Sequence, residues 1–159
     1  MNRRVFVSSV SAVSAIALSQ RAFAHHGWSS FDETKPIYLV GTVKSMKWQN
    51  PHVELVVTMK PDAKLPSDLA KRAAPPQSTP VDGAKILANA ALPTKRGDWT
   101  LELSPMTRIE AWKVAQPKVG DTIEAVAYTF KDEKGAAIAR VEYLIIGEKL
   151  YGLRSMPAL

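Results

Sequence analysis

The chain has 159 residues, none of them cysteine, and a formal net charge of +6. Without cysteine it can form no disulfide, no thiolate metal site and no cysteine nucleophile. The positive charge is too mild and too scattered to indicate nucleic-acid binding.

Residues 1–24 have the three parts of an export signal. Arg3 and Arg4 form the basic start, residues 5–18 form a short apolar stretch, and Ala22-Phe23-Ala24 is a small-x-small cleavage site. The start also resembles a twin-arginine signal, with a general secretory signal as the alternative. The apolar stretch is shorter than the ~20 residues that span a bilayer, so we expect no stable membrane insertion. Cleavage after Ala24 would leave a periplasmic or secreted protein whose net charge falls to +3, because the signal carries three arginines and no acid.

The first predicted strand runs from Leu39 to Lys44 and extends at most to Trp48. Asn50-Pro51 then breaks it, because proline fixes its own φ and biases the preceding residue towards an extended conformation. The second strand, 52–60, alternates cleanly between apolar and other residues, which is typical of a half-buried strand. This alternation places His52 on the side opposite the core.

Residues 61–95 are rich in proline and alanine and indicate an insertion between two strands. We expect it to be solvated and partly mobile, with short helical turns at 69–73 and 84–92. A third strand follows at 99–103, and Ser104-Pro105 predicts a helix over 106–114 with Ser104 as its N-cap. Two further strands, 122–130 and 137–146, are joined by a turn at 132–135. No clear pattern follows Gly147.

The fold class is therefore mainly β. Five strands with one short helix between the third and fourth is the order of an OB-like five-stranded barrel, and a small β-sandwich is the alternative. We expect one barrel domain over 25–150, including the 61–95 insertion, and a C-terminal tail over 151–159.

Several motifs follow one another in a familiar order: His25-His26-Gly27, Phe31-Asp32, Gly41-Thr42-Val43, Trp48-x-Asn50-Pro51-His52, Trp99-x-x-Glu102 and Gly120-Asp121. Together they resemble a family of small secreted bacterial proteins classed as a domain of unknown function. Two features depart from the family's pattern. The 61–95 insertion is longer than its usual turn, and Ala111-Trp112 stands where Gly-Trp is expected. The resemblance implies export and a compact fold, and it implies no chemistry.

The three histidines of the chain lie at two marked places, and this predicts a metal site formed by His25, His26 and His52. Cleavage after Ala24 would give His25 a free α-amine, which chelates a metal together with the Nδ1 of the same residue. His52 would add a third nitrogen, as in the arrangement called a histidine brace. Nitrogen ligands favour copper over zinc. The alternative is that the terminal histidines are solvated and that His52 caps the turn.

Neighbouring residues complete this predicted site. Glu102, Glu54 and Asp32 are candidates to orient a metal-bound imidazole, although exposed carboxylates are usually only solvated. Trp48, Asn50 and Pro51 are expected to line the site. The other tryptophans, Trp28, Trp99 and Trp112, are expected in the core.

The sequence contains no signature of a catalytic residue. It has no Gly-x-Ser-x-Gly, no phosphate-binding loop and no His-Glu-x-x-His. The leading hypothesis is a periplasmic protein that handles copper without turnover. The first alternative is a metal-free OB-like module that binds a periplasmic protein or small ligand, and the last is a copper-dependent oxidative enzyme.

Overall fold

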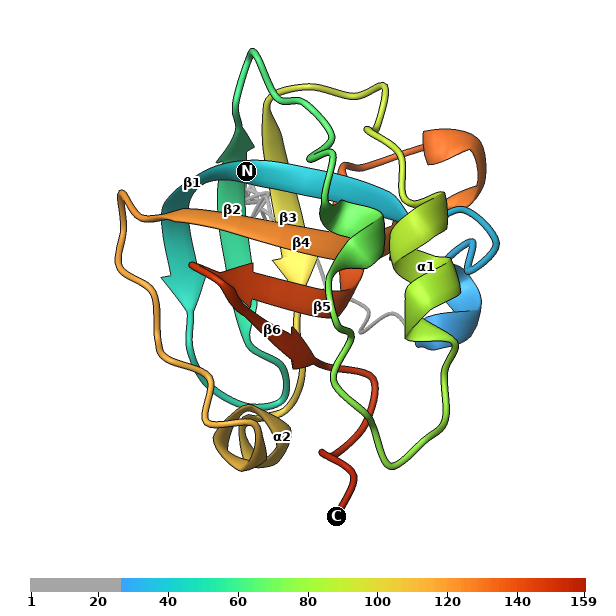
Figure 1. Ribbon diagram of the computed structural model, residues 1–159. Helices are drawn as coiled ribbons and strands as arrows, with labels where there is room; N and C mark the ends of the chain where they lie inside the picture. The colour runs from blue at the N-terminus through green and yellow to red at the C-terminus, as the bar shows by residue number, and fades with distance from the viewer. Residues whose placement is uncertain (1–26) are drawn as a thin grey trace, which may run out of the picture.

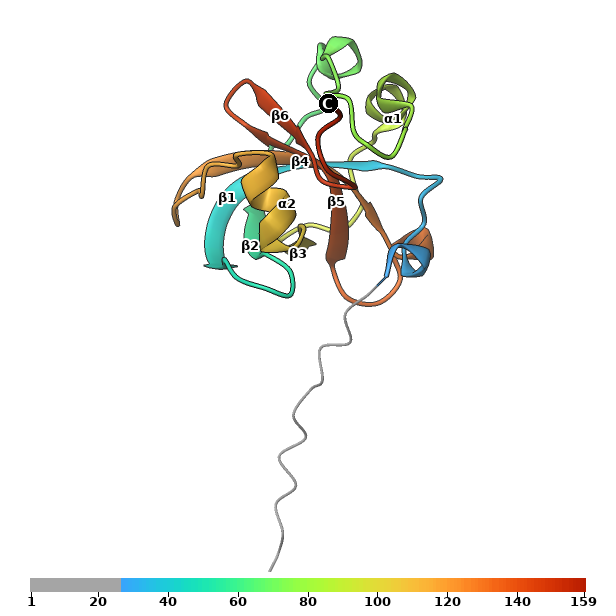
Figure 2. The same ribbon diagram turned by 90° about the horizontal axis from the view of Figure 1, so that it is seen from below.

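Six strands form one sheet in residues 27–159, the part of the chain that the computed structural model describes (Figures 1 and 2). They are β1 (Ile37–Lys47), β2 (Glu54–Met59), β3 (Asp98–Glu102), β4 (Thr122–Thr129), β5 (Ile138–Ile146) and β6 (Lys149–Gly152). The short helices are α1 (Gly83–Asn89) and α2 (Met106–Ala111), with 3-10 turns η1 (Trp28–Ser30), η2 (Leu69–Lys71) and η3 (Lys131–Glu133). Within this described range no helix is long and apolar enough to cross a membrane.

A parallel pairing closes five of these strands into a barrel. The strand order is β3-β2-β1-β4-β5-β6, and β3 also pairs with β5. All the other pairings between neighbours are antiparallel. α2 follows β3 and lies across one end of the barrel (Figure 1). The predicted OB-like barrel, with a helix between its third and fourth strands, is confirmed, and the sandwich alternative is not adopted.

The alternation of β2 and β3 fills the barrel interior as the sequence predicts. The inward row of β2 is at most 4% exposed and that of β3 is 1% exposed; these rows are Val53, Leu55, Val57 and Met59, and Trp99, Leu101 and Leu103. Gly41 lets β1 curve closely against β2, because a Cβ there would lie 2.3 Å from the carbonyl oxygen of Thr58. These rows fix which residues of β2 and β3 face outward.

The 61–95 insertion is anchored on the barrel by a few buried residues, although most of its residues are exposed, as expected for a solvated segment. Its helical turns form where predicted, as η2 and α1, but each contributes a leucine to a second core. Leu69 and Leu87 are both 1% exposed and pack with Tyr38, Val126 and Tyr143 on the outside of the sheet. In Figure 1 this segment covers one side of the barrel. Burial of Leu69 and Leu87 is favourable, and it offsets part of the conformational entropy that this alanine- and proline-rich insertion loses when it becomes ordered.

Leu87→Ala is therefore expected to lower the free energy of unfolding by about 2–4 kcal/mol, since it removes a buried side chain from this second core. Urea denaturation measures the change. Leu65→Ala is the matched control in the same insertion; Leu65 is 44% exposed, and surface substitutions of this kind usually change stability by less than about 0.5 kcal/mol. Equal stability of the two variants would show that the insertion is not part of the folded core.

Two predictions about the later part of the chain are also corrected. The segment after Gly147 forms β6, which pairs with β5, and Leu153 is buried. Ser104 is not the side-chain N-cap of α2, because its hydroxyl donates a hydrogen bond to the carbonyl of Leu153 at 2.7 Å. The tail also pairs with the insertion through Gln77 and Pro157. The C-terminal tail is held by single contacts of this kind. It therefore lacks the regular apolar alternation that would have identified it in the sequence.

Candidate functional site

The predicted metal ligands fall on both sides of the boundary of the described chain. His25 and His26 lie outside the described residues, whereas His52 lies inside them. Among residues 27–159 no group of three or more histidines, cysteines or acids could hold a metal ion. A metal site that includes His52 and has three or more such ligands therefore needs ligands from outside this range.

His52 lies at a corner that is tied to α2. The Asn50–Pro51 peptide bond is cis, and the Oδ1 of Asn50 accepts a hydrogen bond from the backbone N–H of Met106 at 2.9 Å. His52 itself is half-buried. Beyond it, Val53 exchanges backbone hydrogen bonds with Leu103 and Ser104, at 2.8 and 3.0 Å. The motif Trp48-x-Asn50-Pro51-His52 thus positions the histidine two residues before β2 begins. Asn50 has a structural role there, and both Asn50 and Pro51 are exposed.

Glu54 and Glu102 lie opposite each other on adjacent strands. They are register partners between β2 and β3, as predicted from their shared outward face. Glu54 is half-buried, and it follows His52 by two residues on that face. Glu102, however, is only 8% exposed, so the expectation of a solvated carboxylate is wrong for this residue.

A buried arginine explains the burial of Glu102. Arg140 is the register partner of Glu102 on β5, and its Nε lies 4.0 Å from the Oε2 of the glutamate. Arg140 also donates a hydrogen bond from Nη1 to the carbonyl of Leu103 at 3.1 Å. Burial lowers the pKa of this guanidinium, and the charge of Glu102 opposes that shift. Glu102 could therefore orient a neighbouring imidazole only while it also neutralises the charge of Arg140.

Trp28 lies on the outside of the barrel between two arginines and is not a core residue. The guanidinium of Arg140 lies 5.5 Å from its ring centroid, and that of Arg154 lies 4.1 Å away. The edge of the ring meets Tyr128, with centroids 6.2 Å apart. Cation–π contacts of this kind hold an aromatic ring in place. The beginning of the described chain is thus fixed against β4 and β5.

The neighbouring N-terminal residues are also anchored. Phe31, which follows η1, stacks on Phe130, which precedes η3, with ring centroids 5.2 Å apart. Asp32 accepts hydrogen bonds from the backbone and the hydroxyl of Thr34, which lower the pKa of its carboxyl. The carboxylate of Asp32 is therefore held within its own turn by Thr34.

The remaining tryptophans are only partly as predicted. Trp99 is buried in the barrel. Trp48 is half-buried and packs against the barrel core, next to the His52 corner. Trp112 is half-buried and donates its ring N–H to the carbonyl of Ser155 at 2.8 Å. Trp48, predicted to line the site, thus packs partly buried against the core, while Trp112, predicted in the core, is half-buried and fastens the C-terminal tail.

Sequence reasoning missed a buried ionic network behind Trp28. Glu142 is fully buried and accepts hydrogen bonds from the Nε of Arg154 at 2.7 Å and from the amide of Gln77 at 2.9 Å. Burial raises the pKa of Glu142, and Arg154 and Gln77 oppose that shift. One feature of the sequence could have indicated this network: two charged residues, Arg140 and Glu142, interrupt the otherwise apolar strand β5.

Comparison with protein families identifies a related family. The model of a family of unknown function (DUF6152) matches residues 13–67, which include the histidine pair and the Trp48–His52 motif. The resemblance proposed from these motifs is confirmed over this region. Neither the curated proteins nor the solved structures give a match.

Proposed function

We propose that the protein is exported, that cleavage after Ala24 exposes His25, and that it then binds one Cu(II) ion. The ligands are the α-amine and Nδ1 of His25 and the imidazole of His52. The role is metal handling outside the cytoplasm, without turnover. The observation that carries the proposal is the position of Trp28, which fixes the start of the described chain to the barrel near the face that bears His52.

A row of register partners connects Trp28 to this face. Arg140 beneath Trp28 pairs with Glu102, and Glu102 pairs with Glu54. Adjacent strands are about 4.8 Å apart, so the row spans about 10 Å from β5 to β2. His25 precedes Trp28 by three residues, which reach at most about 10–11 Å when extended. His52 lies two residues beyond Glu54, which adds about 7 Å along the strand, so the two imidazole side chains would have to cover the part of the distance that the backbone does not.

The donor set favours copper over zinc. Three nitrogen donors suit Cu(II), which stands above Zn(II) in the stability order. His26 is then an additional ligand or an unbound neighbour, and Glu54 is close enough in sequence to His52 to orient its imidazole. Because amine and imidazole must lose a proton to bind, with ordinary pKa values near ~8 and ~6.5, affinity falls as the pH is lowered through that range.

His52→Ala is expected to weaken Cu(II) binding by at least roughly 100-fold, because it removes the only ligand that the barrel contributes. Competition titration against a copper chelator measures the affinity of the purified protein with His25 as its first residue. His26→Ala is titrated in parallel: retained affinity identifies His26 as an unbound neighbour, and a loss identifies it as an additional ligand. Thermal unfolding without metal confirms that both variants fold. Unchanged affinity in His52→Ala would exclude the proposed ligand set.

A further inference from the structure

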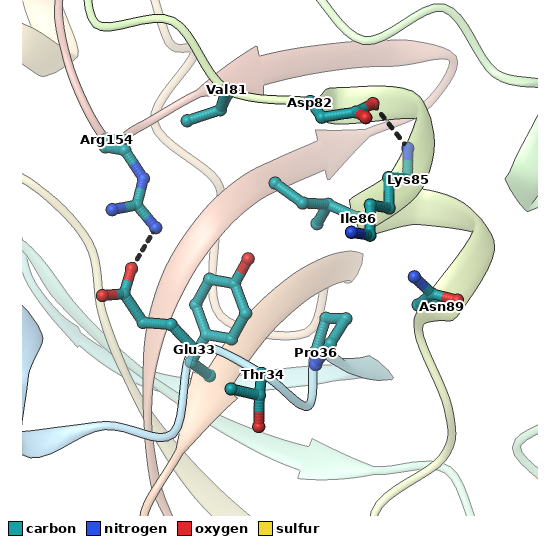
Figure 3. Close-up of a pocket in the computed structure, with 10 residues that line it drawn as sticks. Glu33, Thr34, Pro36, Val81, Asp82, Lys85, Ile86, Asn89 and Arg154 are labelled. Carbon is teal, nitrogen blue, oxygen red and sulfur yellow. Dashed lines mark hydrogen bonds and ion pairs between the residues drawn. The ribbon is translucent and has the colours of Figure 1, made fainter.

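A cavity of about 510 Å³ lies between the insertion and the barrel, and Arg154 lines one side of it (Figure 3). Its apolar wall is formed by Pro36 and Tyr128 of the barrel and by Val81 and Ile86 of the insertion. Cavities of a few hundred Å³ with an apolar lining and a few placed polar groups are typical small-molecule sites. The cavity exists because the insertion of this chain packs against the barrel.

One side of the cavity presents a guanidinium that is held on three sides. Arg154 stacks on Trp28 at 4.1 Å, donates from Nε to the buried Glu142 at 2.7 Å, and pairs through Nη2 with Glu33. The side chain of Glu142 is 0% exposed, whereas that of Glu33 is 40% exposed. The inner partner is therefore fixed, and the outer partner can turn away without leaving a buried charge unpaired.

The other side of the cavity carries a second set of polar groups. Asp82 accepts a hydrogen bond from the backbone N–H of Lys85 at 3.0 Å, which caps α1. The ammonium of Lys85 and the amide of Asn89 make no hydrogen bond to any other residue of the 27–159 range and face Arg154 and Glu33 across the cavity (Figure 3). The cavity is thus lined by two bases and two acids around an apolar wall.

We propose that this cavity binds a free α-amino acid with an apolar side chain. The ligand carboxylate takes the outer side of Arg154, with Lys85 as a second cation. The ligand carboxylate displaces Glu33 from Arg154. The displaced Glu33 carboxylate then pairs with the ligand ammonium. The ligand side chain packs on Tyr128 and Ile86. A lone anion or cation would satisfy only one half of this set, whereas a zwitterion satisfies both with charge-assisted hydrogen bonds.

The site is independent of the proposed copper site and needs none of the histidines. L-leucine is the probe, added to the purified protein without metal, and amide resonances of Val81 and Asn89 report occupancy. We expect a saturable shift with L-leucine and at least about tenfold weaker binding of N-acetyl-leucine and of leucinamide, since each lacks one charge. No saturable shift up to the solubility limit, or equal binding of the three compounds, would overturn the proposal.

Variants locate the site and test its charges. Glu33→Gln and Lys85→Ala are both at exposed positions, so they leave the core intact, and each is expected to weaken L-leucine binding by about tenfold. Asn89→Trp, also exposed, fills the cavity and abolishes binding. Lys64→Ala is the control, an exposed lysine in the same insertion that does not line the cavity. Equal loss in Lys64→Ala, or full binding by Asn89→Trp, would place the ligand elsewhere.

Discussion

One additional residue ahead of His25 is expected to lower the affinity for Cu(II) by roughly 10²–10⁴-fold. The extension converts the α-amine of His25 into a peptide nitrogen, which removes one donor and opens the chelate ring with Nδ1. His52 then remains as a single imidazole on the barrel, and within residues 27–159 no cluster of acids or histidines can replace the lost donor. Competition titration of the extended and unextended proteins measures the difference.

A removable extension is the internal control. A protease site placed so that cleavage leaves His25 as the first residue is expected to restore full affinity in the same sample. The described barrel begins after this segment, so thermal unfolding without metal should be the same before and after cleavage. Equal copper affinity before and after cleavage would contradict a site that uses the α-amine.

Arg154→Met is expected to lower the free energy of unfolding at pH 7 by about 3–5 kcal/mol. The substitution keeps an unbranched side chain against Trp28 but removes the charge that balances Glu142. Because Glu142 is fully buried and receives two hydrogen bonds, one of them from Arg154, its carboxylate is left with Gln77 alone. Urea denaturation at a series of pH values measures the loss.

The pH dependence of this loss has a defined sign. Burial raises the pKa of Glu142 above its ordinary value of 4.5, and Arg154 opposes that shift, so its removal raises the pKa further. An acid with a raised pKa destabilises the folded state as the pH rises through that pKa, and contributes no penalty below its unfolded value. The loss in Arg154→Met is therefore small below about pH 4.5 and grows towards neutral pH. The double variant Arg154→Met/Glu142→Gln recovers part of the stability at pH 7, and a loss independent of pH would contradict this account.

The barrel could be predicted from the sequence because its signals are local. The alternation of Val53, Leu55, Val57 and Met59 defines the face of β2 from the chain alone. The order of strands around a single helix then restricts the topology. The parallel pairing of β3 with β5 closes the barrel and follows from this order, although no short-range pattern encodes it.

The second core could not be predicted in the same way. Leu69 and Leu87 stand as isolated apolar residues among alanine, proline and lysine, and their burial depends on Tyr38, Val126 and Tyr143 of distant strands. Composition therefore indicated a solvated segment, whereas long-range packing determines the outcome.

The candidate site shows the same division between local and long-range signals. The corner at His52 and the shared face of Glu54 and Glu102 follow from local pattern. The burial of Glu102 depends on Arg140, 38 positions later in the numbering, and the location of Trp28 depends on Arg154. Ion pairs between distant segments leave no periodic signature, so the electrostatics of this face became visible only in the fold.

Native mass spectrometry of the protein purified from cells that produce the full 159-residue chain tests the central claim most directly. It reads the first residue and any bound metal in one experiment. The account predicts a chain that begins at His25 and carries one copper ion, which is lost in the same measurement on His52→Ala. A chain that begins at any other residue, or one that begins at His25 and takes up no copper when Cu(II) is supplied, would contradict it.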